Sequence, residues 1–264
     1  MILFLFLSHL GLGIVFTLAF VSREAGVKFF RFNAGLAAIL IAVALAFRPA
    51  ESGAGGTATL ALMALLVSEA ATVIYWATVG RGLASIRPAL VVVGVAGGVA
   101  ALFGQAAATS PDRSLPMQVL TAASFLSSAV FLGGACTAMI LGHWYLIIPS
   151  MQVRHLQSIV KLHIVSMVVR IAVVAAAIIV GMALWQPGLG PSFRHYVFSV
   201  SGIFFWQRVL FGLAGPALLS YLTWETAKIR STQSATGILY VDFFTVVVGE
   251  VLSKYLLLAT RVPV

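Results

Sequence analysis

The sequence predicts an all-α integral membrane protein, a polytopic helix bundle of about eight transmembrane helices that forms a single transmembrane domain over residues 1–264. The first observation behind this prediction is composition. Hydrophobic residues make up 61% of the chain and charged residues 9%, and the mean hydropathy is +1.08, whereas a soluble domain is about a quarter charged. The second observation is that long apolar runs alternate with short polar breaks. No polar run is long enough to form a water-soluble domain.

Eight runs of mostly apolar residues approach the roughly 20 residues that a helix needs to cross the hydrocarbon core. They are 1–22, 34–49, 57–80, 86–108, 117–146, 158–184, 197–223 and 235–259. The first run lacks the basic leader of a signal peptide, so we expect it to remain as a helix. Proline, glycine or charged residues separate the runs. The second run is short, and the prediction falls to seven spans if that run does not cross.

The basic residues are distributed unequally between the two sets of alternate loops. One set carries nine of them: Arg23, Lys28, Arg31, Arg81, Arg87, Arg154, Lys161, Lys228 and Arg230. The other set carries four: Arg48, Arg113, Arg194 and Arg261. Because cytoplasmic loops retain Lys and Arg, both termini are predicted to be non-cytoplasmic, in a multi-pass protein of the cell inner (plasma) membrane. The net charge of +9 is then mostly a topology signal, which argues against a nucleic-acid partner and leaves the lipid bilayer as the expected one.

Histidines border the turn between the fifth and sixth runs. His143 lies near the end of one run and His163 near the start of the next, so we expect them at similar depth near the predicted cytoplasmic side. Two such imidazoles can be the axial ligands of a haem b iron or flank a quinone head group. His155, in the connection, is an alternative ligand, and His9 lies nearer the opposite face. The competing interpretation is that these side chains only form hydrogen bonds at the interface. Covalent c-type haem is excluded, because the chain has no CxxCH motif.

Ionisable side chains inside a bilayer are costly and usually have a task. Those within the predicted spans are Glu69, Arg170, Arg208, Asp242, Glu250 and Lys254. Arg208 and Glu250 lie at matching depth on consecutive helices, which predicts an ion pair. His163 and Arg170 share one helix face, and Asp242 lies at a depth where it can form a proton-accepting pair with His163 beside a quinone. The alternative is that these charges only fix the packing of the bundle.

Two segments, GHWYL at 142–146 and RSTQSATGILYVDFFTVVVGE at 230–250, differ from the uniformly apolar sequence of an ordinary membrane helix. With about eight helices and no soluble domain, the chain resembles the membrane-anchor subunits of bacterial respiratory oxidoreductases, of the dimethyl-sulfoxide-reductase and polysulfide-reductase kind. That resemblance implies electron exchange between a quinone and an iron–sulfur partner subunit, with haem b in some members. The resemblance is one of overall architecture, and it assigns no functional residue of that family to a position in this chain.

Three functional hypotheses follow. The first is a membrane subunit of a quinone-linked oxidoreductase, which exchanges electrons and protons with quinone, with or without haem b, and assembles with other subunits. The second is a transporter or channel for protons or a small solute, with Glu69, Arg208 and Glu250 along its path. Broken helices or an internal repeat would favour it, and neither is evident in the sequence. The third is a non-catalytic assembly subunit. No hydrolase or nucleotide-binding motif is present.

Overall fold

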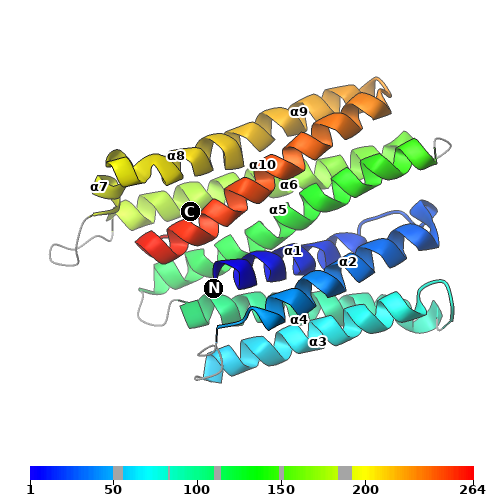
Figure 1. The fold of residues 1–264 in the computed structure, drawn as a ribbon, viewed down its shortest axis with the longest axis horizontal. Helices are drawn as coiled ribbons and strands as arrows, with labels where there is room; N and C mark the ends of the chain where they lie inside the picture. Colours follow the sequence, from blue (N-terminus) through cyan, green and yellow to red (C-terminus); the bar gives the residue numbers. More distant parts are fainter. Residues whose placement is uncertain (50–55, 83, 110–113, 149–151, 184–191) are drawn as a thin grey trace.

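The computed structural model describes residues 1–49, 56–82, 84–109, 114–148, 152–183 and 192–264, and this part of the chain is an all-helical bundle (Figure 1). The α-helices are α1 (Ile2–Leu18), α2 (Gly26–Ala46), α3 (Gly56–Thr78), α4 (Arg87–Thr109), α5 (Leu115–Ile147), α6 (Val153–Ala183), α7 (Phe193–Phe198), α8 (Ile203–Val209), α9 (Gly215–Lys228) and α10 (Thr232–Thr260). Short 3-10 turns are η1 (Arg23–Ala25), η3 (Ala84–Ile86) and η4 (Val200–Gly202), and η5 (Leu210–Ala214) is a π-helix.

Seven segments of the described chain are long and apolar enough to cross a membrane, and α1, with 17 residues, is shorter. The prediction that the second run is the short one is wrong. That helix begins at Gly26, because the chain turns through η1 directly after α1, and Gly26 adopts φ 81°, which favours glycine. The first run correspondingly ends at Leu18 rather than at residue 22.

The helices alternate in direction along the bundle (Figure 1). The C-terminal ends of α1, α3, α5 and α9 lie at one end, and both chain termini lie toward the other. This is the arrangement that the alternating loops predict. That the end with the termini faces away from the cytoplasm stays a prediction.

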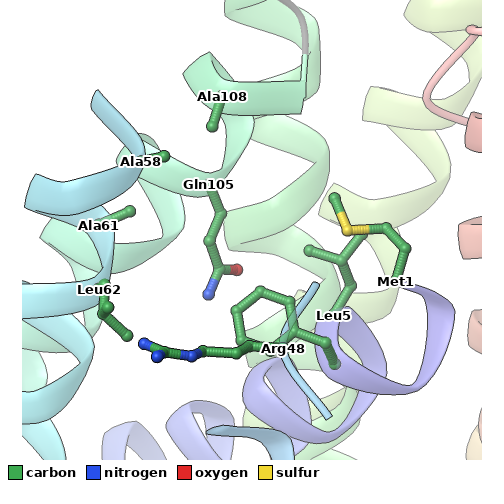
Figure 2. Close-up of a pocket in the computed structure, with 9 residues that line it drawn as sticks. Met1, Leu5, Arg48, Ala58, Ala61, Leu62, Gln105 and Ala108 are labelled. Carbon is green, nitrogen blue, oxygen red and sulfur yellow. The ribbon is translucent and has the colours of Figure 1, made fainter. Parts of the chain in front are cut away.

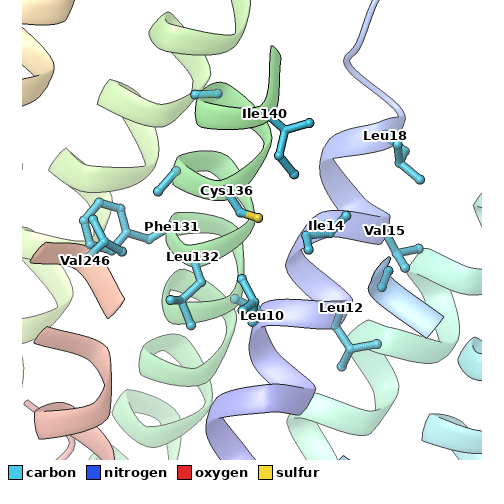
Figure 3. Close-up of a cluster of buried hydrophobic side chains, with 14 of the residues drawn as sticks. Leu10, Leu12, Ile14, Val15, Leu18, Phe131, Leu132, Cys136, Ile140 and Val246 are labelled. Carbon is cyan, nitrogen blue, oxygen red and sulfur yellow. The ribbon is translucent and has the colours of Figure 1, made fainter. Parts of the chain in front are cut away.

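Helix α1 is a central element of the fold and packs against α2, α4, α5 and α10. Most of its residues are buried, as expected for a helix that is apolar on all sides. Figure 3 shows Leu10 and Ile14 of α1 close to Leu132 and Cys136 of α5, within one continuous apolar core. The lone cysteine is therefore a packing residue.

Two glycines allow the backbones of α1 and α5 to touch. A Cβ atom at Gly13 would overlap the carbonyl oxygen of Ala129, and a Cβ atom at Gly133 would overlap the backbone of Gly13. Small residues that permit such approach are the main packing device of membrane helices. One turn further, the hydroxyls of Thr17 and Thr137 are 2.6 Å apart, which ties the same two helices by a hydrogen bond.

Gly13→Val is expected to destabilise the bundle by roughly 1–3 kcal/mol or more, because the added atoms must force α1 away from α5. The matched control is Gly237→Val on α10, where an added Cβ meets nothing within 4 Å. Both substitutions place valine inside a helix, so they share the same cost in helix propensity. Thermal unfolding in detergent measures the difference, and equal melting temperatures for the two variants would contradict the close crossing.

The seventh predicted run is an irregular helix. The segment Val200–Lys228 includes η4, α8, the π-helix η5 and α9, and the extended backbone of Ser199 separates it from α7. Pro216 lies in the first turn of α9, and Gly212 in the π-helix packs against Gly249 of α10, where an added Cβ would come 2.5 Å from the Gly249 Cα. Proline and π-helical turns are recognised causes of helix interruption, and π-helical turns are frequent at functional sites. The sequence analysis did not predict the π-helical turn that follows Arg208.

Candidate functional site

Four ionisable side chains meet in the interior of the bundle. Arg170 comes from α6, Arg208 from α8, and Glu250 and Lys254 from α10, and none of them is more than 1% exposed. We call these four residues the charged cluster. The Nε and Nη2 atoms of Arg170 lie 2.9 and 3.2 Å from the two carboxylate oxygens of Glu250. Arg208 Nη2 lies 2.8 Å from Glu250 Oε1, which forms the predicted pair, and Lys254 Nζ lies 3.5 Å from Oε2.

The π-helical turn in the seventh segment positions Arg208 within this cluster. Its Nη1 atom donates to the carbonyl oxygen of Gly212, in the π-helix, at 2.8 Å. A Cβ atom at Gly249 would lie 2.9 Å from that same Nη1 atom. The two glycines that bring η5 against α10 therefore also leave the space that the guanidinium group occupies.

Hydroxyl groups complete the coordination of the charged cluster. Arg170 donates to Ser124 Oγ at 2.7 Å and to Ser253 Oγ at 2.8 Å. Ser128 donates to Glu250 Oε2 at 2.5 Å and accepts from Lys254 Nζ at 2.7 Å. Such bonds satisfy polar atoms that the apolar core cannot. With every group ionised, three cations face one carboxylate, and buried charge of one sign is expensive. A site with surplus charge is suited to exchange a proton.

A second buried pair lies at another level of the same helices. His163 Nε2 lies 2.8 Å from Asp242 Oδ2, both side chains are fully buried, and Ser220 Oγ lies 3.5 Å from the same carboxylate oxygen. The imidazole also stacks on the ring of Phe131, with centroids 5.3 Å apart. His163 Nδ1 and Asp242 Oδ1 have no hydrogen-bond partner among the described residues. The sequence predicted this pair from depth alone.

A buried hydroxyl lies in the interval between the pair and the charged cluster. Asp242 and Glu250 are eight residues apart on α10, which corresponds to about 12 Å along the axis. Ser166 lies between His163 and Arg170 on the same face of α6 and is 5% exposed. Ser127 of α5 lies 3.4 Å from Arg170 Nη1. The buried hydroxyl of Ser166 therefore lies within this interval, as does the fully buried apolar side chain of Val246.

A small cavity lies at the end of the bundle that holds the termini. It has a volume of about 40 Å³ and is lined by residues of α1, α3 and α4 and by Arg48. Figure 2 shows Gln105 extending into it on the side of Arg48. Gln105 is only 5% exposed, and its amide nitrogen and oxygen have no partner among the described residues. Since a water needs about 10–15 Å³ of such space, the cavity has room for a few.

His9 lies between this cavity and the charged cluster. It is adjacent to Gln105 on one side, and its Nδ1 atom lies 3.3 Å from Ser128 Oγ on the other. Its Nε2 atom has no partner in the described part of the chain. Ser128 in turn donates to Glu250. A series of polar side chains thus leads from the cavity to the carboxylate.

The remaining predicted site residues lie elsewhere. Glu69 is half-buried on α3, which packs against α2 and α4 rather than against the helices of the charged cluster. His155 Nε2 lies 2.6 Å from Glu24 Oε2, a contact that ties α6 to η1. His143 is exposed on α5, where its Nδ1 atom lies 3.0 Å from the hydroxyl of Tyr240.

The prediction that His143 and His163 lie at similar depth is wrong. His163 lies against Phe131 and Gly134, with its Cα atom 3.5 Å from a Cβ built at Gly134. His143 is nine residues further along α5, about 13.5 Å by helical rise. The two imidazoles are therefore not placed to ligate one haem iron together. Among the described residues, no group of three or more His, Cys, Asp or Glu side chains is arranged to hold a metal ion.

Sequence reasoning missed the serines of α5, Gln105 and the role of Lys254 as a member of the cluster. Signals were present for the serines and for Lys254. Ser124, Ser127 and Ser128 recur at the spacing of one helix face, and Lys254 follows Glu250 by one turn.

Comparison of the chain with family models, with curated proteins and with solved structures gives no match.

Proposed function

We propose that this chain carries protons through the interior of a membrane, either as a transporter in its own right or as the proton-conducting subunit of a membrane complex. The observation that carries the proposal is the series of buried polar groups that runs from the cavity at Gln105, through the charged cluster, to the His163–Asp242 pair. Chains of Asp, Glu and His side chains inside a bundle are the usual means of moving protons across a bilayer.

The spacing of the two sites along α10 supports this proposal. The helix has 29 residues and is about 42 Å long. Asp242 and Glu250 divide it into three steps of roughly 15, 12 and 15 Å. No step needs to cross the full hydrocarbon thickness. The buried hydroxyl of Ser166 lies along the middle step, and the Gln105 cavity shortens the step from the end that holds the termini.

The residues divide into two roles. Arginine does not lose its proton in proteins, so Arg170 and Arg208 position Glu250 and set the charge around it. Carboxylates, imidazoles and the lysine amine do exchange protons. We assign the exchange steps to His9, Glu250 and Lys254 at one level and to His163 with Asp242 at the other. In the predicted orientation the pair lies nearer the cytoplasm of a plasma-membrane protein.

Reconstituted vesicles test this function. With a potassium gradient and valinomycin to set the potential, and a pH-sensitive dye inside, the wild-type chain is expected to admit protons faster than protein-free vesicles do. Gln105→Leu should slow the flux by roughly threefold to tenfold, the effect of losing one hydrogen bond to a water at the rate-limiting passage. Glu225→Gln, at an exposed pair with Lys228, should conduct as the wild type does. A wild-type rate equal to that of empty vesicles would overturn the proposal.

A second candidate is the quinone-linked subunit, and the His163–Asp242 pair favours it. The pair offers an imidazole nitrogen and a carboxylate oxygen that the described residues leave unpartnered, and reducing a quinone requires protons as well as electrons. Quinone extracted in stoichiometric amount from protein purified in mild detergent would support this candidate. A pyridine haemochrome spectrum of the same sample would show whether haem b is present.

A further inference from the structure

A second, larger cavity lies at the opposite end of the bundle, between the α1–α2 and α3–α4 connections. Its volume is about 480 Å³. The apolar part of its lining includes Leu18, Phe30, Val79 and Val91. This is the end at which α1 and α3 finish and which carries the excess of basic residues.

The polar lining of this cavity is basic. Arg23 of η1 and Arg87, the first residue of α4, both line it, together with the buried Tyr75 of α3. Arg87 donates through Nη2 to the carbonyl oxygens of Thr78 and Gly82 at 3.2 and 2.9 Å, which fixes its position. Its Nε atom is buried and has no partner in the described part of the chain.

The acidic residue next to Arg23 in the sequence does not neutralise these arginines. Glu24, next to Arg23, is turned toward α6, where it lies 3.6 Å from Arg154 and 2.6 Å from His155. Within the described residues the side chain of Arg23 forms no hydrogen bond or ion pair; its backbone carbonyl oxygen accepts from the Gly26 N–H. Two guanidinium groups and a phenol thus face one cavity with no carboxylate among its lining residues.

We propose that this cavity binds the phosphate of an anionic phospholipid. Arginine matches phosphate geometry through several donors, and basic pockets between membrane helices on the cytoplasmic side are suited to lipid head groups. The apolar wall below the arginines accommodates the upper part of an acyl chain, which a free phosphate lacks. The proposal is independent of proton conduction, because no residue of the cavity belongs to the charged cluster or the His163–Asp242 pair.

Binding of short-chain lipids to the full chain in a neutral detergent tests this site. Dioctanoyl-phosphatidylglycerol is expected to bind and to raise the melting temperature, and dioctanoyl-phosphatidylcholine is expected to do neither. Arg23→Gln should weaken phosphatidylglycerol binding on the order of tenfold, since one charge-assisted contact is lost. Arg87→Gln should weaken it as well, but this variant also removes the bonds to Thr78 and Gly82. Arg23→Gln is therefore the decisive variant.

Two further variants and two further ligands make the test specific. Lys161→Gln removes an exposed basic residue of α6 outside the cavity, and its binding should equal that of the wild type. Ala84→Trp narrows the cavity without changing its charge and should abolish binding. Equal loss in Lys161→Gln would show non-specific attraction and overturn the proposal. Inorganic phosphate binding as tightly as the lipid, or decylubiquinone binding that is insensitive to Arg23→Gln, would assign the cavity to another ligand.

Discussion

Glu250→Gln is expected to destabilise the protein by about 3–5 kcal/mol, the cost of breaking a buried ion pair from one side. Glu250 is the carboxylate that Arg170, Arg208 and Lys254 share, and all four side chains are buried. Glutamine keeps the shape and one acceptor oxygen but removes the negative charge. Three cations would then remain in the interior without a counter-charge. Thermal or denaturant unfolding in detergent measures the loss.

Two comparisons separate this effect from the loss of a hydrogen bond. Glu225→Gln removes a carboxylate whose pair with Lys228 is largely exposed, and it should leave the melting temperature nearly unchanged. Adding Lys254→Met to Glu250→Gln removes one of the three cations, so the double variant should recover part of the lost stability. If Glu250→Gln has the same melting temperature as the wild type, the charged cluster does not stabilise the fold.

The sequence was sufficient for the class of fold and for most of the helix positions. Composition and run length predict an all-helical membrane bundle, because lipid is the only solvent that such a surface tolerates. The boundary between the first two helices was missed. The residues around Lys28 and Arg31 are polar enough to look like a loop, yet basic side chains extend from a helix end toward the head groups at little cost.

Depth arguments succeeded for some pairs of the site and failed for others. They placed Arg208 with Glu250, and Asp242 with His163, because helical rise is constant and these helices start at comparable levels. They failed for His143 because α6 begins at Val153 rather than at residue 158. His163 is therefore ten residues from the turn, whereas His143 is four residues from the end of α5.

The contact of Arg170 with Glu250, and the hydroxyl groups around both, could not be predicted without the three-dimensional fold. The sequence places Arg170 on a polar face of its helix, but it does not say which neighbour that face meets. The π-helix after Arg208 and the Gly212–Gly249 contact bring the seventh segment close to α10, so that the guanidinium group of Arg208 reaches Glu250. Irregular backbone of this kind leaves little trace in hydropathy, because every residue from Leu210 to Ala214 is apolar or glycine.

Asp242→Asn is expected to reduce proton flux in vesicles by about 100-fold or more, since general acid–base groups contribute factors of this size. Asparagine is isosteric and its amide oxygen can still accept a hydrogen bond from His163 Nε2, so the fold should be retained. What the amide cannot do is accept and release a proton. Dye-loaded vesicles measure the flux, and the melting temperature of the same sample reports the fold.

The matched control for Asp242→Asn is His143→Gln, which removes an exposed imidazole that contacts Tyr240 and lies off the proposed route. It should conduct at the wild-type rate. A conducting Asp242→Asn variant would mean that protons bypass the His163–Asp242 pair, and it would leave this pair with a purely structural role. Loss of flux in Asp242→Asn with an unchanged melting temperature would mean that protons pass through the His163–Asp242 pair. Because the pair lies about 12 Å from Glu250, such a result cannot come from a disturbed charged cluster and requires a proton to pass through Asp242 itself.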